Sequence, residues 1–129
     1  MGEGEYFLKV CGLGFVVSWL WEALHSALYS SYMNGPITVF ILFRAAFVDA
    51  VIISVSIFIA RKFGKYKTLF ILSAGLVVAV IIETWSLQTG RWEYNSLMPI
   101  IPVIKTGLTP TIQLAVTAYF VEKIIHKEK

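Results

Sequence analysis

The sequence predicts an all-α integral membrane protein in which four transmembrane helices form one up-and-down bundle. Of its 129 residues, 57% are hydrophobic and 15% are charged, whereas soluble chains carry about 25% charged residues. A helix that spans a bilayer needs about 20 mainly apolar residues. The chain has four such runs within a single domain, 1–129: about 9–29, 36–60, 68–88 and 98–125, the last starting at 110 if it is interrupted.

The basic residues predict the orientation of the helices. If the helices alternate in direction, eight basic residues share one side: Lys9, Arg61, Lys62, Lys65, Lys67, Lys123, Lys127 and Lys129. The opposite loops carry Arg91. Because cytoplasmic loops are rich in Lys and Arg, both termini are predicted to be cytoplasmic. We therefore expect a multi-pass protein of a prokaryotic cytoplasmic (plasma) membrane, and no nucleic-acid partner.

The first helix carries a polar stripe. Its members are four, three and four residues apart, a spacing that keeps them on one helical face: Ser18, Glu22, His25 and Tyr29. The segment before the helix, Met1–Glu5, is acidic where a signal peptide is basic, so we expect this helix to be retained.

The second and third helices carry charges inside apolar runs. Arg44 and Asp49 lie about 140° apart around a helix, so each should face a different neighbour. Glu83 lies in the third run. Ionisable groups at membrane depth are costly, and they are therefore candidates for function.

The fourth run predicts a kinked or interrupted helix near Gly107–Pro110. A continuous helix from Met98 to Ile125 would be about 42 Å long, too long to span a bilayer without strong tilt. Thr109 is a suitable N-cap, and Pro110 suits a first helical position. The segment 98–104 would then lie in the outer leaflet, and Gln113 would belong to the spanning helix.

These polar groups are predicted to share one layer. At 1.5 Å per residue they lie about 16 to 24 Å above the cytoplasmic helix ends. Three carboxylates would face Arg44 and His25 in this layer, so we expect Arg44 to pair with one carboxylate and another to carry a proton.

We accordingly predict two groups of site residues. The catalytic candidates are Glu22, His25, Asp49 and Glu83. The binding candidates are Arg44, Trp21, Trp85 and Gln113. A second Glu-x-x-His motif is absent and Cys11 is the single cysteine, so no metal centre and no cofactor are expected.

Three functions fit this pattern. The first is binding or proton-coupled transport of a small cationic substrate by the carboxylates, with His25 relaying protons. The second is a membrane-embedded enzyme that uses acid–base chemistry on a lipid or isoprenoid, with Trp21 and Trp85 lining the pocket. The third is a packing subunit without a ligand. In each case we expect contact with membrane lipids and a homo-oligomer.

Two families offer partial resemblances. In size, helix number and a glutamate in the first helix, Glu22, the chain resembles the small multidrug-resistance transporters, which implies transport. The sequence Gly90-Arg-Trp-Glu-Tyr94, followed by a proline and an apolar run, resembles the carotenoid (lycopene) cyclases, which implies chemistry on an isoprenoid. The acidic motif that follows in those cyclases is absent, because Thr111 and Gln113 stand near Pro110.

Overall fold

The computed structural model describes residues 2–32 and 35–127. It is mostly helical, with these elements in chain order: α1 (Glu3–His25), η1 (Ser26–Leu28), β1 (Tyr29–Tyr32), α2 (Val39–Ala60), η2 (Arg61–Tyr66), α3 (Lys67–Gln88), β2 (Trp92–Tyr94) and α4 (Leu108–Lys127). Two stretches, Glu3–Leu28 and Val39–Gln88, are long and apolar enough to cross a membrane by length and composition. Lys129, counted above among the basic residues, lies outside the described part.

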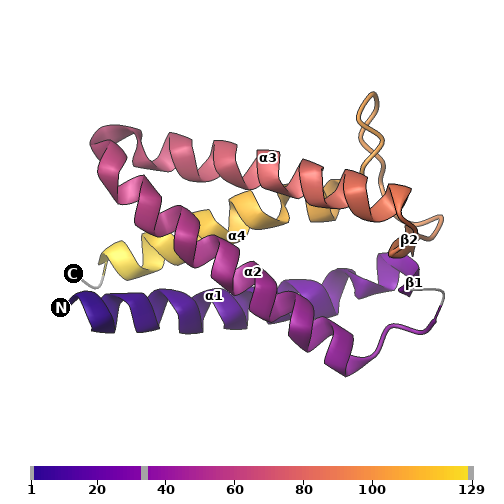
Figure 1. Cartoon of the computed structure of the whole chain (residues 1–129), viewed down its shortest axis with the longest axis horizontal. Helices are drawn as coiled ribbons and strands as arrows, with labels where there is room; N and C mark the ends of the chain where they lie inside the picture. The colour runs from indigo at the N-terminus through magenta and orange to yellow at the C-terminus, as the bar shows by residue number, and fades with distance from the viewer. Residues whose placement is uncertain (1, 33–34, 128–129) are drawn as a thin grey trace.

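The helices form two closely packed pairs. α1 packs mainly on α2, and α3 packs mainly on α4, whereas α2 and α3 make far fewer contacts. Figure 1 shows α2 and α3 joined at η2 and diverging toward the other end of the bundle. Both chain ends lie at the η2 end, and the two strands lie at the opposite end. We call the end with the strands the strand end.

Ion pairs join the helices near η2. Arg61 donates two hydrogen bonds, of 2.9 and 3.2 Å, to the carboxylate of Glu3. Lys67 Nζ lies 2.5 Å from Oε1 of Glu122, which is buried on α4. Several of the basic residues used to predict orientation therefore gather at one end of the bundle.

The strand end differs from the sequence-based expectation. The first helix ends at His25, and Tyr29 begins a strand instead of continuing the polar stripe. β1 pairs with β2 in an antiparallel two-stranded sheet, with Tyr29 opposite Tyr94 and Tyr32 opposite Trp92. The all-α prediction omitted this small sheet because strands of four and three residues carry too little periodicity to be recognised.

The fourth helix begins where the sequence predicts an interruption. α4 starts at Leu108, and a bridge between Ile100 and Gly107 closes the irregular segment before it. This segment projects from the bundle in Figure 1, and Val103 at its tip is 93% exposed. Thr109 does not cap the helix as expected, because its hydroxyl group faces His25, 3.1 Å from Nδ1.

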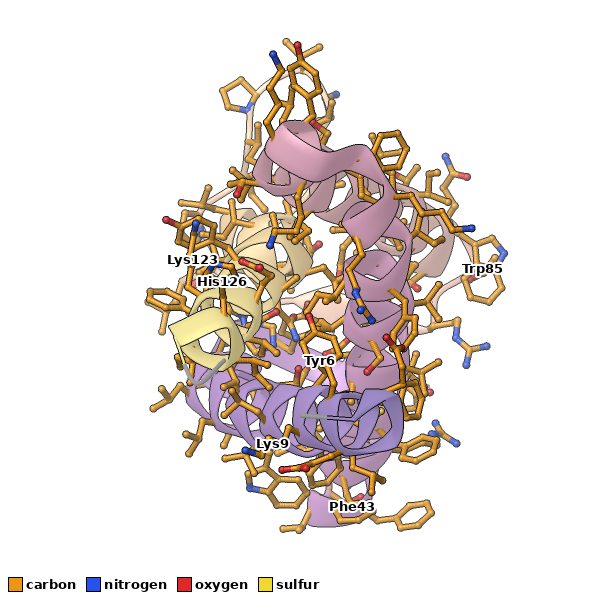
Figure 2. All side chains as sticks on the ribbon, turned by 90° about the vertical axis from the view of Figure 1, so that its left-hand side faces the viewer. Tyr6, Lys9, Phe43, Trp85, Lys123 and His126 are labelled. Carbon is orange, nitrogen blue, oxygen red and sulfur yellow. The ribbon has the colours of Figure 1, made fainter. Side chains whose placement is uncertain are left out.

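Side-chain polarity is distributed unusually across the bundle. Large apolar side chains project outward from every long helix, with Leu24 81% exposed and Phe40 70% exposed. Buried polar groups include Ser18, Gln113 and Thr117. Viewed from the η2 end, Figure 2 shows Tyr6 pointing between the helices, while Phe43 and Trp85 project outward. The polar groups that form the site are thus enclosed by apolar helix surfaces.

Gly75 sets the distance between α3 and α4. A Cβ atom built on Gly75 would lie 2.5 Å from the backbone nitrogen of Ala115 and 2.6 Å from its Cα. Real Cβ atoms do not approach backbone so closely, and the backbone cannot move aside as a flexible side chain can. The tight α3–α4 pair therefore depends on glycine at this position.

We expect Gly75→Ala to destabilise the protein by about 1–3 kcal/mol, because the added methyl group forces the two helix backbones apart. Unfolding in mixed micelles would measure the change. Gly12→Ala is the matched control, since a Cβ atom there meets nothing within 4 Å; it should be neutral or stabilise by up to about 1 kcal/mol. Equal stability of the two variants would contradict the close-packing interpretation.

Candidate functional site

A cavity of about 350 Å³ lies between α2 and α3 in the half of the bundle nearer the strands. Its volume is at the lower end of the range for small-molecule sites, about 300–1,000 Å³. The lining is mostly apolar, and α2 supplies much of it through Ile41, Leu42 and Val48. The cavity is open to the surface of the bundle, and the half-exposed Trp85 lies at its edge.

A glutamate–histidine pair lies in the wall formed by α1. His25 Nε2 is 3.0 Å from Oε2 of Glu22, and His25 Nδ1 is 3.1 Å from Oγ1 of Thr109. His25 is buried, and Glu22 is largely buried. Since both ring nitrogens have a hydrogen-bond partner, the imidazole is held in one orientation.

Gln113 joins this pair to a second carboxylate. Its Nε2 donates to Oε1 of Glu22 at 2.8 Å and also to Oδ2 of Asp49. The two carboxyl groups come from α1 and α2, and the shared amide group comes from α4. A single donor group thus brings together two acidic side chains, which repel each other when both are ionised.

Glu83 forms a separate centre on α3. Its carboxylate is buried and accepts three hydrogen bonds: from Trp92 Nε1 at 3.0 Å, Tyr94 OH at 2.6 Å and Tyr29 OH at 3.3 Å. All three donors belong to β1 and β2. Tyr94 OH in turn accepts a hydrogen bond from the backbone N–H of Gly107, at 3.0 Å.

The two tyrosines that donate to Glu83 remain neutral phenols. Burial raises the pKa of Tyr29 far above its usual range, and the nearby Glu83 carboxylate raises it further. Burial likewise raises the pKa of Tyr94, together with the hydrogen bond that it donates to Glu83. Both hydroxyl groups therefore keep their protons and act as permanent donors at ordinary pH.

Two arginines lie at the mouth of the cavity. Arg44 on α2 and Arg91, just before β2, both donate through Nη2 to the Tyr32 hydroxyl group. The expected ion pair between Arg44 and a carboxylate is not formed within the described part of the chain. The carboxylates lie deeper, where Gln113 and the residues of β1 and β2 supply their donors.

The structure gathers the predicted site residues, with one exception. The residues that line the cavity include Glu22, His25, Asp49, Glu83, Arg44, Trp85 and Gln113. Trp21 is not among them: its ring contacts His25 edge-on, and its buried Nε1 has no partner among the described residues. Trp85 contributes at the cavity edge and points outward (Figure 2).

Sequence reasoning missed several residues of the site. Trp92 and Tyr94 were not among the predicted site residues, and their hydrogen bonds to Glu83 were not foreseen. A usable signal was present, because a carboxylate inside an apolar run requires donors and these residues follow it within one loop. Tyr29 and Tyr32 reach the site only through the pairing of β1 with β2, which no local pattern reveals.

The arrangement suits proton transfer better than metal binding. Within residues 2–32 and 35–127, no group of three or more His, Cys, Asp or Glu side chains is placed to hold a metal ion. The pair of Glu22 and His25 can accept a proton, and Asp49 can carry one.

The chain matches no protein-family model, no curated protein and no solved structure.

We expect Glu83→Gln to destabilise the protein by about 1.5–3 kcal/mol, because an amide group cannot accept the three hydrogen bonds that the carboxylate accepts. Chemical unfolding in mixed micelles would measure the loss. Glu93→Gln is the matched control, since Glu93 is an exposed residue of β2, and it should be neutral. If both variants were as stable as the original chain, Glu83 would not organise the strand end.

Proposed function

We propose that the chain is an integral membrane protein with four spanning helices that binds a mostly apolar small molecule in the cavity between α2 and α3. The helices have 23, 22, 22 and 20 residues, and each is long enough for a bilayer core of about 30 Å. Their outward surfaces carry large apolar side chains, as a lipid environment favours. The basic end of the bundle is assigned to the cytoplasm.

We further propose that the protein is an enzyme that moves a proton on a lipid or isoprenoid substrate. One observation carries this proposal: the hydrogen-bonded group of Glu22, His25, Asp49 and Gln113 lines a mostly apolar cavity that is open to the surface of the bundle. A cavity of that kind admits a lipid-like molecule directly from the bilayer. A paired acid and base can shift a carbon–carbon double bond, because one group adds a proton and the other removes one.

The proposed reaction is an isomerisation and conserves all atoms. Asp49, in its protonated form, gives a proton to one carbon of the double bond, and positive charge develops on the other. The Glu22–His25 pair removes a proton from the adjacent carbon, and the electrons of that C–H bond form the shifted double bond. The Glu22–His25 pair then releases its proton to solvent and Asp49 takes one up, so each turnover brings one solvent proton onto carbon, while Gln113 holds the two carboxyl groups in place. Nearby aromatic faces, such as Tyr29, stabilise the positive charge.

Deuterium incorporation tests this proposal without knowledge of the exact substrate. The protein would be reconstituted in D₂O into vesicles that contain a mixture of unsaturated lipids and isoprenoids. The masses of the extracted lipids would then be measured by mass spectrometry. We expect one lipid class to gain deuterium on carbon. Glu22→Gln and Asp49→Asn should each lower the rate by at least about 100-fold, because general acid–base groups contribute about 10²–10⁴-fold.

Lys105→Gln is a suitable control, because Lys105 lies in the projecting segment before α4 and does not line the cavity. It should keep full incorporation. Melting temperatures would show that the inactive variants are folded. If no lipid gained deuterium in any reconstitution, or if Glu22→Gln and Asp49→Asn kept full activity, the enzyme proposal would be rejected.

A second function, the binding and proton-coupled transport of a cation, is favoured by the carboxylates of Glu22, Asp49 and Glu83 in one cavity lining. Tetraphenylphosphonium is a suitable probe because it is both apolar and positively charged. If the protein transports cations, its affinity for tetraphenylphosphonium should fall as the pH falls, because protonated carboxyl groups attract a cation less. Double replacement of Glu22 and Asp49 by amides should weaken the pH dependence, because only Glu83 of the three carboxylates then remains. Binding that is independent of pH in the original chain would exclude this alternative.

A further inference from the structure

The two arginines at the cavity mouth lack an acidic partner. Arg44 and Arg91 both donate to Tyr32 OH, which is a neutral oxygen. No carboxylate among the described residues lies within salt-bridge distance of either guanidinium group. Their aromatic contacts are neutral too, since Arg44 lies over the Tyr32 ring and Arg91 over the Trp85 ring, at 5.6 and 5.0 Å. Two positive charges therefore converge on one point without compensation.

A buried hydroxyl group in the same cavity also lacks a partner. Ser86 on α3 lines the cavity, its side chain is fully buried, and its Oγ has no hydrogen-bond partner among the described residues. Buried polar groups are almost always satisfied by protein, water or ligand. Ser86 Oγ thus remains to be satisfied by water or by a ligand, as do Ser18 Oγ and Trp21 Nε1 elsewhere among the described residues.

Polarity changes along the cavity. The mouth is cationic at Arg44 and Arg91, the walls formed by α2 are apolar, and the acidic group of Glu22 and Asp49 lies further in. A molecule that matches this order has an anionic head at the mouth and an apolar chain. The end of that chain, which lies deepest in the cavity, carries no charge. A simple cation matches the inner group but is repelled at the mouth.

We propose that Arg44, Arg91 and Tyr32 bind the phosphate or diphosphate head of a ligand whose apolar chain fills the cavity. This proposal rests on the proposed function in one respect, that the cavity binds an apolar molecule. Phosphate is favoured because it offers several oxygens to donors that converge from different elements, and arginine is well suited to phosphate recognition. With the head at the mouth, the carbons that reach Glu22 belong to the chain.

Titration calorimetry in an uncharged detergent tests the head-group site. The probes would be farnesyl diphosphate, farnesol (which lacks the anion) and inorganic diphosphate (which lacks the chain). We expect farnesyl diphosphate to bind at least about tenfold more tightly than either of the others. Arg44→Gln and Arg91→Gln should each weaken its binding about tenfold, the usual size for one charge-assisted hydrogen bond, and leave farnesol binding unchanged.

Arg61→Gln is the matched control, because Arg61 pairs with Glu3 near η2, away from the cavity. It should leave the affinity for farnesyl diphosphate unchanged. Phosphatidic acid in a parallel titration distinguishes the source of the phosphate: tighter binding than farnesyl diphosphate identifies a membrane phospholipid, and weaker binding identifies a free phosphorylated chain. Both results support the anion site.

Equal affinity for farnesol and farnesyl diphosphate, or unchanged affinity in both arginine variants, would overturn the head-group site. Farnesol binding would then still support an apolar ligand, so the proposed function would survive. Arginine-dependent binding without any deuterium incorporation would support the head-group site and reject the enzyme. Failure of every probe to bind would reject the head-group site, and the deuterium experiment on mixed lipids would then decide the proposed function separately.

Discussion

The buried carboxylate of Glu83 is the constraint on which the strand end of the molecule depends. A buried negative charge is tolerated only when donors surround it, and these donors come from β1 and β2, segments far apart in the chain. Tyr94 extends the network to Gly107, directly before α4. The start of α4 then places Thr109 beside His25. The orientation of the acid–base group is thus linked to Glu83 through a continuous set of contacts.

The sequence predicted the helical runs and many of the polar groups that meet. Counting residues from the helix ends placed Glu22, Asp49 and Glu83 at one depth, and they line one cavity. The partners of each group were not predictable in the same way. Gln113 could be assigned to a helix, but its contact with two carboxylates depends on helix rotations that near-uniform apolar sequences leave undetermined.

The pairing of helices explains why a cavity exists at all. Gly75 lets α3 approach the backbone of α4, and Gly14 lies against Ala50 where α1 meets α2. Small residues thus bring the members of each pair together. Among the described residues, α2 and α3 make far fewer contacts with each other, and the cavity walls at the strand end carry branched side chains such as Ile41 and Ile82. The two tight interfaces leave the third one open.

The mostly apolar lining of the cavity has a consequence for how a ligand of the proposed class would be supplied in the proposed membrane-spanning arrangement. Such a molecule would dissolve in the bilayer first and reach the cavity by diffusion within a leaflet. Its local concentration is then governed by its partition coefficient between lipid and water. Two ligands that make identical contacts in the cavity would differ in apparent potency if their chains differed in length. Selectivity between substrates would therefore be shared between the protein and the membrane around it.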